Sequence, residues 1–178
     1  MQFAKDSFAV ALRERLAALN PGRTVTLGGV QRPAVVVREN EMPNAAEPAM
    51  ECFYLEWGAC RAVGASGKVA LYGMDCVITY RTWGSVESGV DRGRVLGELD
   101  RELLMICQPS FTGKKDFSQA PAAELGTGVF WSWPQIEVGK NAEGASPLSA
   151  KSAPGRGTAG EVEHAARVRV FFYPEVEW

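Results

Sequence analysis

The chain has 178 residues, of which 46% are hydrophobic and 22% charged, a composition that fits one globular domain with its own core. Lysine and arginine number 19 against 21 acidic residues, so the chain lacks the basic excess by which proteins neutralise nucleic-acid phosphates. No apolar run approaches the roughly 20 residues that span a bilayer, and charges at Lys5 and Asp6 stand where a signal peptide needs its apolar core. We therefore expect synthesis in a cytoplasm, with neither membrane insertion nor specific nucleic-acid binding.

The four cysteines stand singly within apolar patterns and form no CxxC pair; they are Cys52, Cys60, Cys76 and Cys107. We expect them to be reduced and buried, as small apolar side chains. A zinc site would require the only histidine, His164, to join three cysteines from separate elements. We therefore predict no metal and no cofactor.

The first predicted element is a helix capped by Asp6 or Ser7 and ended by the turn at residues 20–22. Its apolar residues recur at spacings of three and four, as in Phe8, Leu12, Leu16 and Leu19. A hairpin follows, in which residues 23–27 turn at Gly28 and Gly29 into a β-branched strand over residues 32–37. Residues 39–49 contain two prolines and no periodicity, which predicts an exposed loop.

Two long strands form the centre of the prediction. Residues 50–63 place Phe53, Leu55 and Trp57 on one face, and a short turn at residues 64–67 favours an antiparallel hairpin. In residues 68–83 every even position from Ala70 to Tyr80 is apolar or aromatic, whereas the odd positions are mixed. This pattern predicts a central strand covered by helices on one side and on the other by more protein, such as a neighbouring subunit.

The second predicted helix follows residues 88–91, where Ser88 and Asp91 have the spacing of a capping box. Its apolar stripe consists of Leu96, Leu99, Leu103 and Ile106. Gly93 and Gly97 lower helix stability by roughly 1 kcal/mol each relative to alanine, which indicates close packing against the sheet.

The last third of the chain alternates predicted loops and strands. Residues 109–128 and 139–160 are rich in turn-forming residues, so we expect two long mobile loops. Residues 129–138 predict one strand, bent or at an edge because of Pro134. Trp131 and Trp133 share one face of it, where paired tryptophans fill a core or a subunit interface or, alternatively, stack on sugars or bases. Residues 161–173 alternate regularly, which predicts a closing strand with His164 at the rim of the core.

No catalytic motif is present, but one alternative is a small-molecule or carbohydrate-binding domain, or an enzyme without a recognisable motif. It would use Trp131, Trp133, Glu56 and His164 around a pocket, because paired indoles stack on sugars and the other two side chains exchange protons. This alternative requires the four side chains to converge in space.

The order of elements provides a resemblance. It lies in the order of five segments: a first helix containing ALRERLAAL, a hairpin ending in RPAVVV, the strand KVALYGMDCVITYRT, the helical stretch ESGVDRGRVLGELDRELLMI and the final segment HAARVRVFFYPEVEW. In this order the chain resembles the tail-terminator, or tail-completion, proteins of long-tailed bacteriophages and prophages. The resemblance spans nearly the whole chain but includes no signature motif. Related head–tail connector and minor tail proteins share much of this outline. The long segments at 109–128 and 139–160 depart from the smaller members of the family.

The resemblance implies a single α+β domain over residues 1–178, with a mainly antiparallel sheet and two principal helices packed on one face. It also implies a non-enzymatic virion protein of the tail or neck, assembled in the bacterial host cytoplasm. The first expected partners are further copies of the chain, which form a ring that we expect to be a hexamer. The other expected partners are the tail-tube protein and a head–tail connector protein. The candidate residues for the oligomer or tube interface are Trp131, Trp133, Arg167, Arg169, Phe171 and Tyr173.

Overall fold

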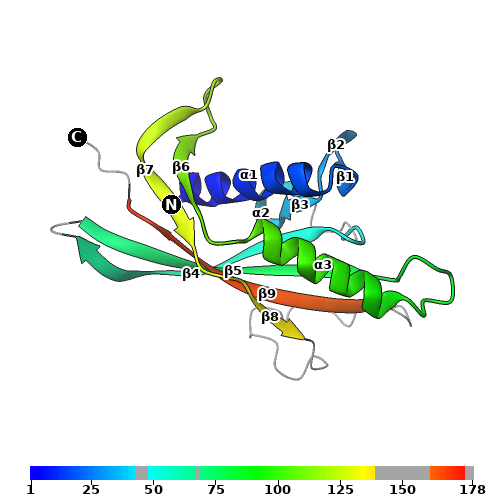
Figure 1. Cartoon of the computed structure of the whole chain (residues 1–178). Coiled ribbons are helices and arrows are strands. Elements are labelled where there is room, and N and C mark those ends of the chain that lie inside the picture. The colour runs from blue at the N-terminus through cyan, green and yellow to red at the C-terminus, as the bar shows by residue number, and fades with distance from the viewer. Residues whose placement is uncertain (43–47, 67–68, 139–160, 175–178) are drawn as a thin grey trace.

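The computed structural model describes residues 1–42, 48–66, 69–138 and 161–174. In these ranges two long helices, α1 (Gln2–Leu19) and α3 (Arg92–Ile106), lie on the same side of one curved sheet (Figure 1). The sheet is antiparallel except for one pair of strands. The predicted α+β fold, with a mainly antiparallel sheet and two principal helices on one face, is therefore confirmed.

The main sheet has seven strands. Their spatial order is β3 (Val35–Val37), β4 (Phe53–Ser66), β5 (Val69–Thr82), β9 (Val162–Phe172), β7 (Ala123–Trp131) and β6 (Phe111–Asp116), and β8 (Gln135–Val138) also pairs with β9. The exception to the antiparallel pattern is β3, which runs parallel to β4. Two further strands, β1 (Thr24–Leu27) and β2 (Val30–Pro33), form a separate hairpin, and α2 (Arg38–Glu41) is a single short turn.

The sheet has an inner face, toward α1 and α3, and an outer face, turned away from them. Strand β5 shows the difference between the two faces. Met74, Cys76, Ile78 and Tyr80 on its inner face are buried, as predicted, whereas the residues between them on the outer face are partly exposed. The core is completed by apolar residues of both helices: Phe8, Leu12 and Leu16 from α1, and Leu96, Leu99, Leu103 and Ile106 from α3. Each of these large side chains stabilises the fold by roughly 1.5–3 kcal/mol through burial.

The helix starts differ from the prediction. Helix α1 begins at Gln2 with Met1 as its N-cap residue, and the Ser7 hydroxyl donates a hydrogen bond to the Phe3 carbonyl within the helix. Serine inside a helix can use the carbonyl four residues earlier as its acceptor, so the residue type alone did not locate the cap. The expected close packing at Gly93 and Gly97 is also wrong, because a methyl group at either position would meet no atom within 4 Å.

The prediction of a mobile loop over residues 109–128 is wrong. These residues form most of the β6–β7 hairpin, which curls away from the sheet toward α1 (Figure 1). Two contacts fix it: the backbone N–H of Lys115 donates to Ser7 Oγ at 3.0 Å, and the Phe111 ring occupies the space above Gly128. Glycines and a short polar turn therefore mark a hairpin that is held by contacts distant in sequence.

Two other predicted strands are divided. Residues 32–37 give β2 and β3, which belong to different sheets, and residues 129–138 give β7 and β8, separated at residues 132–134. Proline removes a backbone donor at Pro33 and Pro134, so an uninterrupted ladder is unfavourable at both places. The predicted mobile loop at 139–160 lies outside the described residues.

Candidate interaction surface

The outer face of the sheet carries charged residues in ion pairs across neighbouring strands. Arg169 of β9 donates through Nε to Asp75 Oδ1 of β5 at 2.9 Å, and Arg61 of β4 lies 4.0 Å from the other oxygen of the same carboxylate. Farther along β9, Arg167 lies 3.6 Å from Glu137 of β8. These arginines are half or more exposed, so their charges remain available to a partner.

A row of phenylalanines crosses the same face. Phe171 of β9 lies opposite Phe130 of β7, and Phe130 lies opposite Phe111 of β6, so the three side chains project on one side of three adjacent strands. Phe171 and Phe130 stack with ring centroids 5.2 Å apart, and Phe111 is 69% exposed. We call Phe111, Phe130 and Phe171 the phenylalanine row; exposed aromatic rows flanked by arginine are typical of protein contacts.

Within the described residues, helical cover on the outer face is limited to the start of β4. There the Arg38 guanidinium of α2 lies 5.5 Å from the centre of the Tyr54 ring and donates to Thr79 Oγ1. The rest of the face, between this corner and the phenylalanine row, has no helix packed against it in these ranges. The structure thus defines a charged and aromatic surface available for interaction.

The structure separates the two tryptophans that the sequence placed on one face. Trp131 is 3% exposed; its indole N–H donates to the Cys107 carbonyl, its ring packs edge-on against Phe8, and Arg15 lies over it at 4.9 Å. Trp133 lies beyond the end of β7 and is 58% exposed. The shared face is therefore wrong: Trp131 belongs to the core and offers no accessible indole, whereas Trp133 remains an interface candidate.

The other interface candidates lie where the alternation of β9 places them. Arg167, Arg169 and Phe171 share the outer face, and Tyr173 follows the strand, where its carbonyl accepts a hydrogen bond from the buried Lys114 ammonium at 2.6 Å. Sequence reasoning missed Phe111 and Phe130. Phe111 was hidden in a segment that reads as turns and Phe130 lay in a predicted strand, and the Phe111–Phe130 and Phe130–Phe171 pairings became visible only once the strands were paired.

The four residues of the alternative pocket do not converge. Glu56 pairs in register with Val77 and is exposed on the outer face, whereas His164 lies on the inner face beside Tyr80. Trp131 pairs with Val170, six residues along β9 from His164, a separation of roughly 20 Å at strand spacing. This geometry contradicts a ligand pocket built from these four side chains.

His164 instead joins a polar cluster between α3 and the sheet. Its Nδ1 lies 2.9 Å from Asp100 Oδ1, and the hydroxyl of fully buried Tyr80 donates to the same oxygen at 2.6 Å. Burial, followed by the nearby Asp100 carboxylate, raises the pKa of the Tyr80 hydroxyl, so that it remains a proton donor. The cluster fastens α3 to β5 and β9, which agrees with the predicted place of the histidine at the rim of the core.

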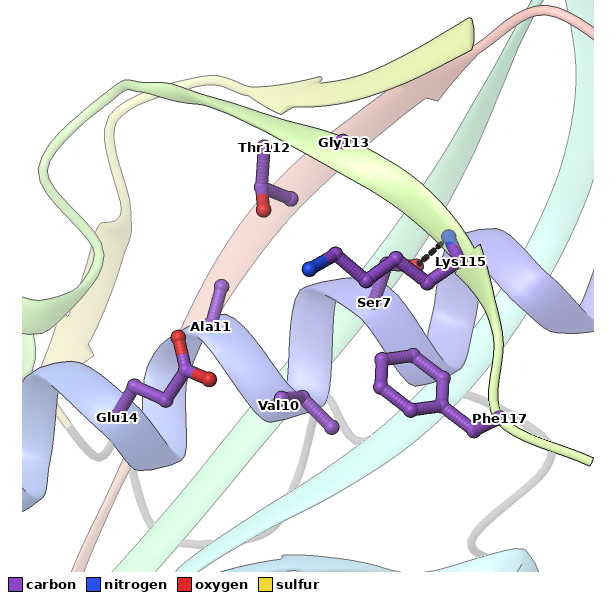
Figure 2. A pocket seen from close by; sticks show the side chains of 8 residues that line it. All are labelled: Ser7, Val10, Ala11, Glu14, Thr112, Gly113, Lys115 and Phe117. Atoms are coloured by element: carbon purple, nitrogen blue, oxygen red, sulfur yellow. Dashed lines mark hydrogen bonds between the residues drawn. The ribbon is translucent and has the colours of Figure 1, made fainter. Parts of the chain in front are cut away.

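A small pocket lies between α1 and β6 (Figure 2). It holds about 60 Å³ and is lined by Glu14, Lys115 and Phe117 with smaller neighbours. That volume is far below the several hundred Å³ of typical ligand sites. Within the described part of the chain no cluster of three potential metal ligands occurs, and no helix there is long and apolar enough to cross a membrane.

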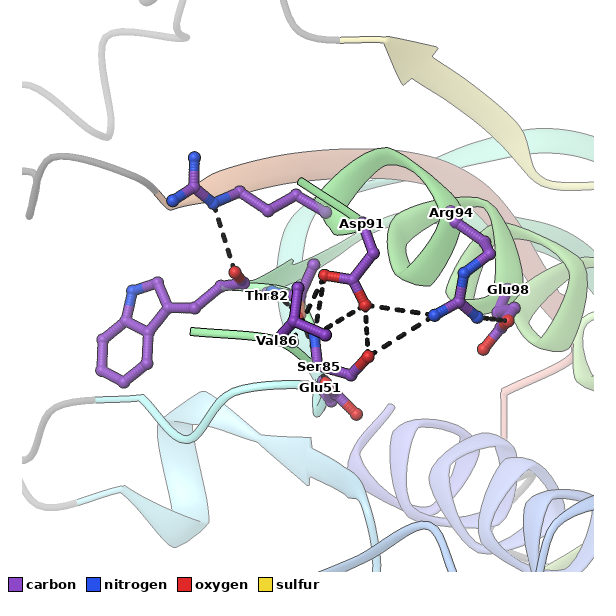
Figure 3. A network of polar contacts seen from close by, with 10 residues as sticks. Glu51, Thr82, Ser85, Val86, Asp91, Arg94 and Glu98 are labelled. Carbon is purple, nitrogen blue, oxygen red and sulfur yellow. Dashed lines mark hydrogen bonds and ion pairs between the residues drawn. The ribbon is translucent and has the colours of Figure 1, made fainter. Parts of the chain in front are cut away.

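A hydrogen-bonded loop connects β5 to α3 (Figure 3). The Asp91 carboxylate accepts bonds from the Ser85 backbone N–H and hydroxyl and from the Val86 N–H, and it pairs with Arg94. The predicted capping box is wrong, because Asp91 is itself the N-cap residue and reaches Ser85 rather than Ser88. The hydrogen bonds from Ser85, despite a smaller opposing effect of desolvation, lower the pKa of the Asp91 carboxyl.

Comparison with known proteins leaves the surface as the main guide to function. No family model matches the chain, and no curated protein matches it.

Proposed function

We propose that the protein is a structural component of a bacteriophage or prophage virion that forms a ring on the tail tube, ends its polymerisation and contributes to the head–tail joint. The observation that carries this proposal is the outer face of the sheet, where Phe171 stacks on Phe130 beside the exposed Arg167 and Arg169. An aromatic centre with a charged rim fits a protein partner better than a small molecule. The order of helices and strands supports the same class through its resemblance to tail terminators.

The mechanism we propose is surface complementarity without catalysis. One side of the ring binds the last ring of tube subunits and the other side differs from a tube subunit, so the next tube subunit has no matching surface. In such a ring each copy contributes two different surfaces, one to each neighbour, and the ring closes when the rotation between copies allows. Termination then requires only that the ring be present when the tube reaches its final length.

The test is the assembly state of the purified chain and its effect on tube growth. Light scattering behind a sizing column, over a wide concentration range, gives the mass, and negative-stain imaging gives the shape of any large species. We expect a discrete ring, and we expect its addition to a polymerising tail-tube protein to leave short, blunt-ended tubes. A compact monomer at all concentrations that leaves tube length unchanged would refute the proposal.

The same experiment separates the closest alternative, another head–tail connector or minor tail protein. A ring that binds an isolated head–tail connector but leaves tube growth unaffected would assign the chain to that alternative. A ring that stops tube growth would assign it to the terminators.

A further inference from the structure

We infer that neighbouring copies of this chain join by sheet extension: the free edge of β4 pairs with β8 of the next copy, with Arg61 against that copy's Glu137. This inference rests on the proposed ring and names the contact within it. It starts from the ends of the main sheet, because a strand edge with unpaired N–H and C=O groups binds a further strand.

One free edge belongs to β4. Strand β3 pairs with β4 only at Phe53, Tyr54 and Leu55, so the part of β4 beyond Leu55 has a described partner, β5, on one side alone. From Gly58 to Ala65 this edge carries small side chains, apart from Arg61 and Val63, and is exposed or half-exposed throughout. It contains one charged residue, Arg61, and no lysine or proline of the kind that commonly blocks edge pairing.

A second free edge belongs to β8, on the opposite side of the sheet, where β6 is the other end strand. Among the described residues, β8 pairs with β9 alone, in the register Gln135↔Arg167 to Val138↔His164. Irregularities in the β4–β5 ladder divide this edge of β4 into short regular segments, of which Cys60–Ala62 and Gly64–Ser66 have three residues each, and β8 has four residues, Gln135–Val138. The segments available on both sides of the joint are therefore short.

Strand direction favours this joint. The pairs β4–β5, β5–β9 and β9–β8 are all antiparallel, so β8 runs antiparallel to β4 within one chain. If rotation about a ring axis continues the sheet from one copy to the next, β4 of one copy and β8 of the next are antiparallel too, which is the more stable ladder. Because the two edges differ, the contact is head-to-tail, and repeated contacts of this kind close into a ring when the rotation allows.

Charge also matches across this joint. Arg61 and Glu137 both lie on the outer face, since their register partners are Gly73 and Ala165, so a continued sheet brings them to the same side. Their side chains are 67% and 64% exposed. Each has only a long contact within its own chain, at 4.0 Å to Asp75 and 3.6 Å to Arg167, which leaves both charges available to the neighbouring copy.

The test uses charge reversal in the full-length chain and light scattering over a concentration series. Arg61→Glu alone and Glu137→Arg alone place like charges at every joint, and we expect assembly to need at least about fivefold higher concentration. In an equimolar mixture of the two variants, alternating copies place opposite charges at every joint, so assembly should return toward the wild-type midpoint. The double variant R61E/E137R, which exchanges the two charges, should assemble in the same way.

Matched controls are Arg101→Glu on α3 and Glu14→Arg on α1, which make the same charge changes at exposed positions away from both edges. They should assemble as the wild type does, and urea unfolding should show all variants folded. If the wild type forms rings and the charge reversals leave the midpoint unchanged, or the mixture fails to rescue, the β4–β8 joint is wrong while the ring stands. If the wild type forms no assembly, the proposed function and this joint fall together.

Discussion

Phe171 and Phe130 stack across β9 and β7 with an interplanar angle of 16°, on the side of the sheet that faces away from both long helices. Next to this pair, Arg169 is held by Asp75 with its guanidinium half exposed. Rings and guanidinium groups fixed in this way lose little conformational freedom on binding, which is a property of strong contact residues. The position of Phe171 therefore yields the most direct test of the outer face.

Phe171→Ala should weaken assembly more than folding. The substitution removes an aromatic contact, and at a central interface position the loss is about 2 kcal/mol per contact, equivalent to about a thirtyfold higher concentration for assembly. Light scattering measures this midpoint. Phe117→Ala is the matched control, because Phe117 lines the pocket beside α1 and not the outer face; an equal loss of assembly in both variants would contradict a specific role for Phe171.

The two neighbouring tryptophans should respond in opposite ways. Trp131→Ala removes a buried ring that packs on Phe8 and bonds to Cys107, so the free energy of unfolding should fall by about 3–5 kcal/mol. Trp133→Ala changes an exposed side chain and should alter the free energy of unfolding by no more than about 0.5 kcal/mol. Urea unfolding followed by circular dichroism provides both values. Comparable losses of stability in the two variants would show that one tryptophan is not buried and the other exposed as described.

The sequence predicted the elements whose alternation has a strong local pattern. The buried positions of β5 from Met74 to Tyr80, the leucines of α3 and the alternation of β9 were predicted correctly, because burial on one face imposes a regular period on the residues. Ala70 and Tyr72, predicted on the same buried face of β5, are only partly buried. The placement of Arg167, Arg169 and Phe171 on one face follows from that period. This part of the candidate surface could therefore be predicted.

The features that were missed depend on contacts between distant residues. Gly128 reads as a turn residue, yet in the structure it lies in a strand and is covered by the ring of Phe111. Ser7 reads as a helix cap, yet its hydroxyl oxygen accepts a hydrogen bond from Lys115, more than a hundred residues away. No local pattern encodes such pairings, so Phe111 and Phe130 could not be assigned to the interaction surface beforehand.

Glu102→Ala should destabilise the fold through a buried ion pair. Glu102 of α3 accepts hydrogen bonds from Arg23 Nε at 2.8 Å and from Asn20 Nδ2 at 2.7 Å, and its side chain is almost fully buried. Arg23 keeps a second carboxylate partner, Glu51, so the expected loss is about 2 kcal/mol rather than the larger value for a completely orphaned charge. Chemical denaturation measures it. Glu98→Ala, an exposed change on the same helix, should stay near the wild type.

Thiol labelling should distinguish one cysteine from the other three. Burial raises the pKa of the Cys52 thiol to about 12 and raises the pKa values of Cys76 and Cys107, so these thiols are neutral and inaccessible at pH 8. Cys60 is the partly exposed one. An aromatic disulfide reagent should label one thiol quickly in the folded protein and four in urea. Cys60→Ser should abolish the fast phase; its persistence would contradict the described burial.

The β5–α3 loop should lose stability in acid because of Asp91. Its carboxyl pKa is lowered in the folded protein by hydrogen bonds from Ser85, so the folded state favours the charged form. This contribution is fully present above the pKa of the unfolded chain, about 3.9, and is lost as the pH falls through the lower pKa of the folded state. Asp91→Asn removes the titrating group. The difference in unfolding free energy between wild type and Asp91→Asn should therefore be constant at pH 6–8 and shrink below about pH 4.

The control for this pH dependence is Asp6→Asn, because Asp6 accepts one exposed hydrogen bond from Gln2 on the first turn of α1 and contacts neither Ser85 nor Arg94. The acid-induced loss of stability that is assigned to Asp91 should remain in the Asp6→Asn variant. The Ser85 amide resonance, followed by nuclear magnetic resonance, should shift with the titration of Asp91 in the wild type and stay constant in Asp91→Asn. A Ser85 shift that survives the substitution would mean that another group titrates against the loop, and the role assigned to Asp91 would be wrong.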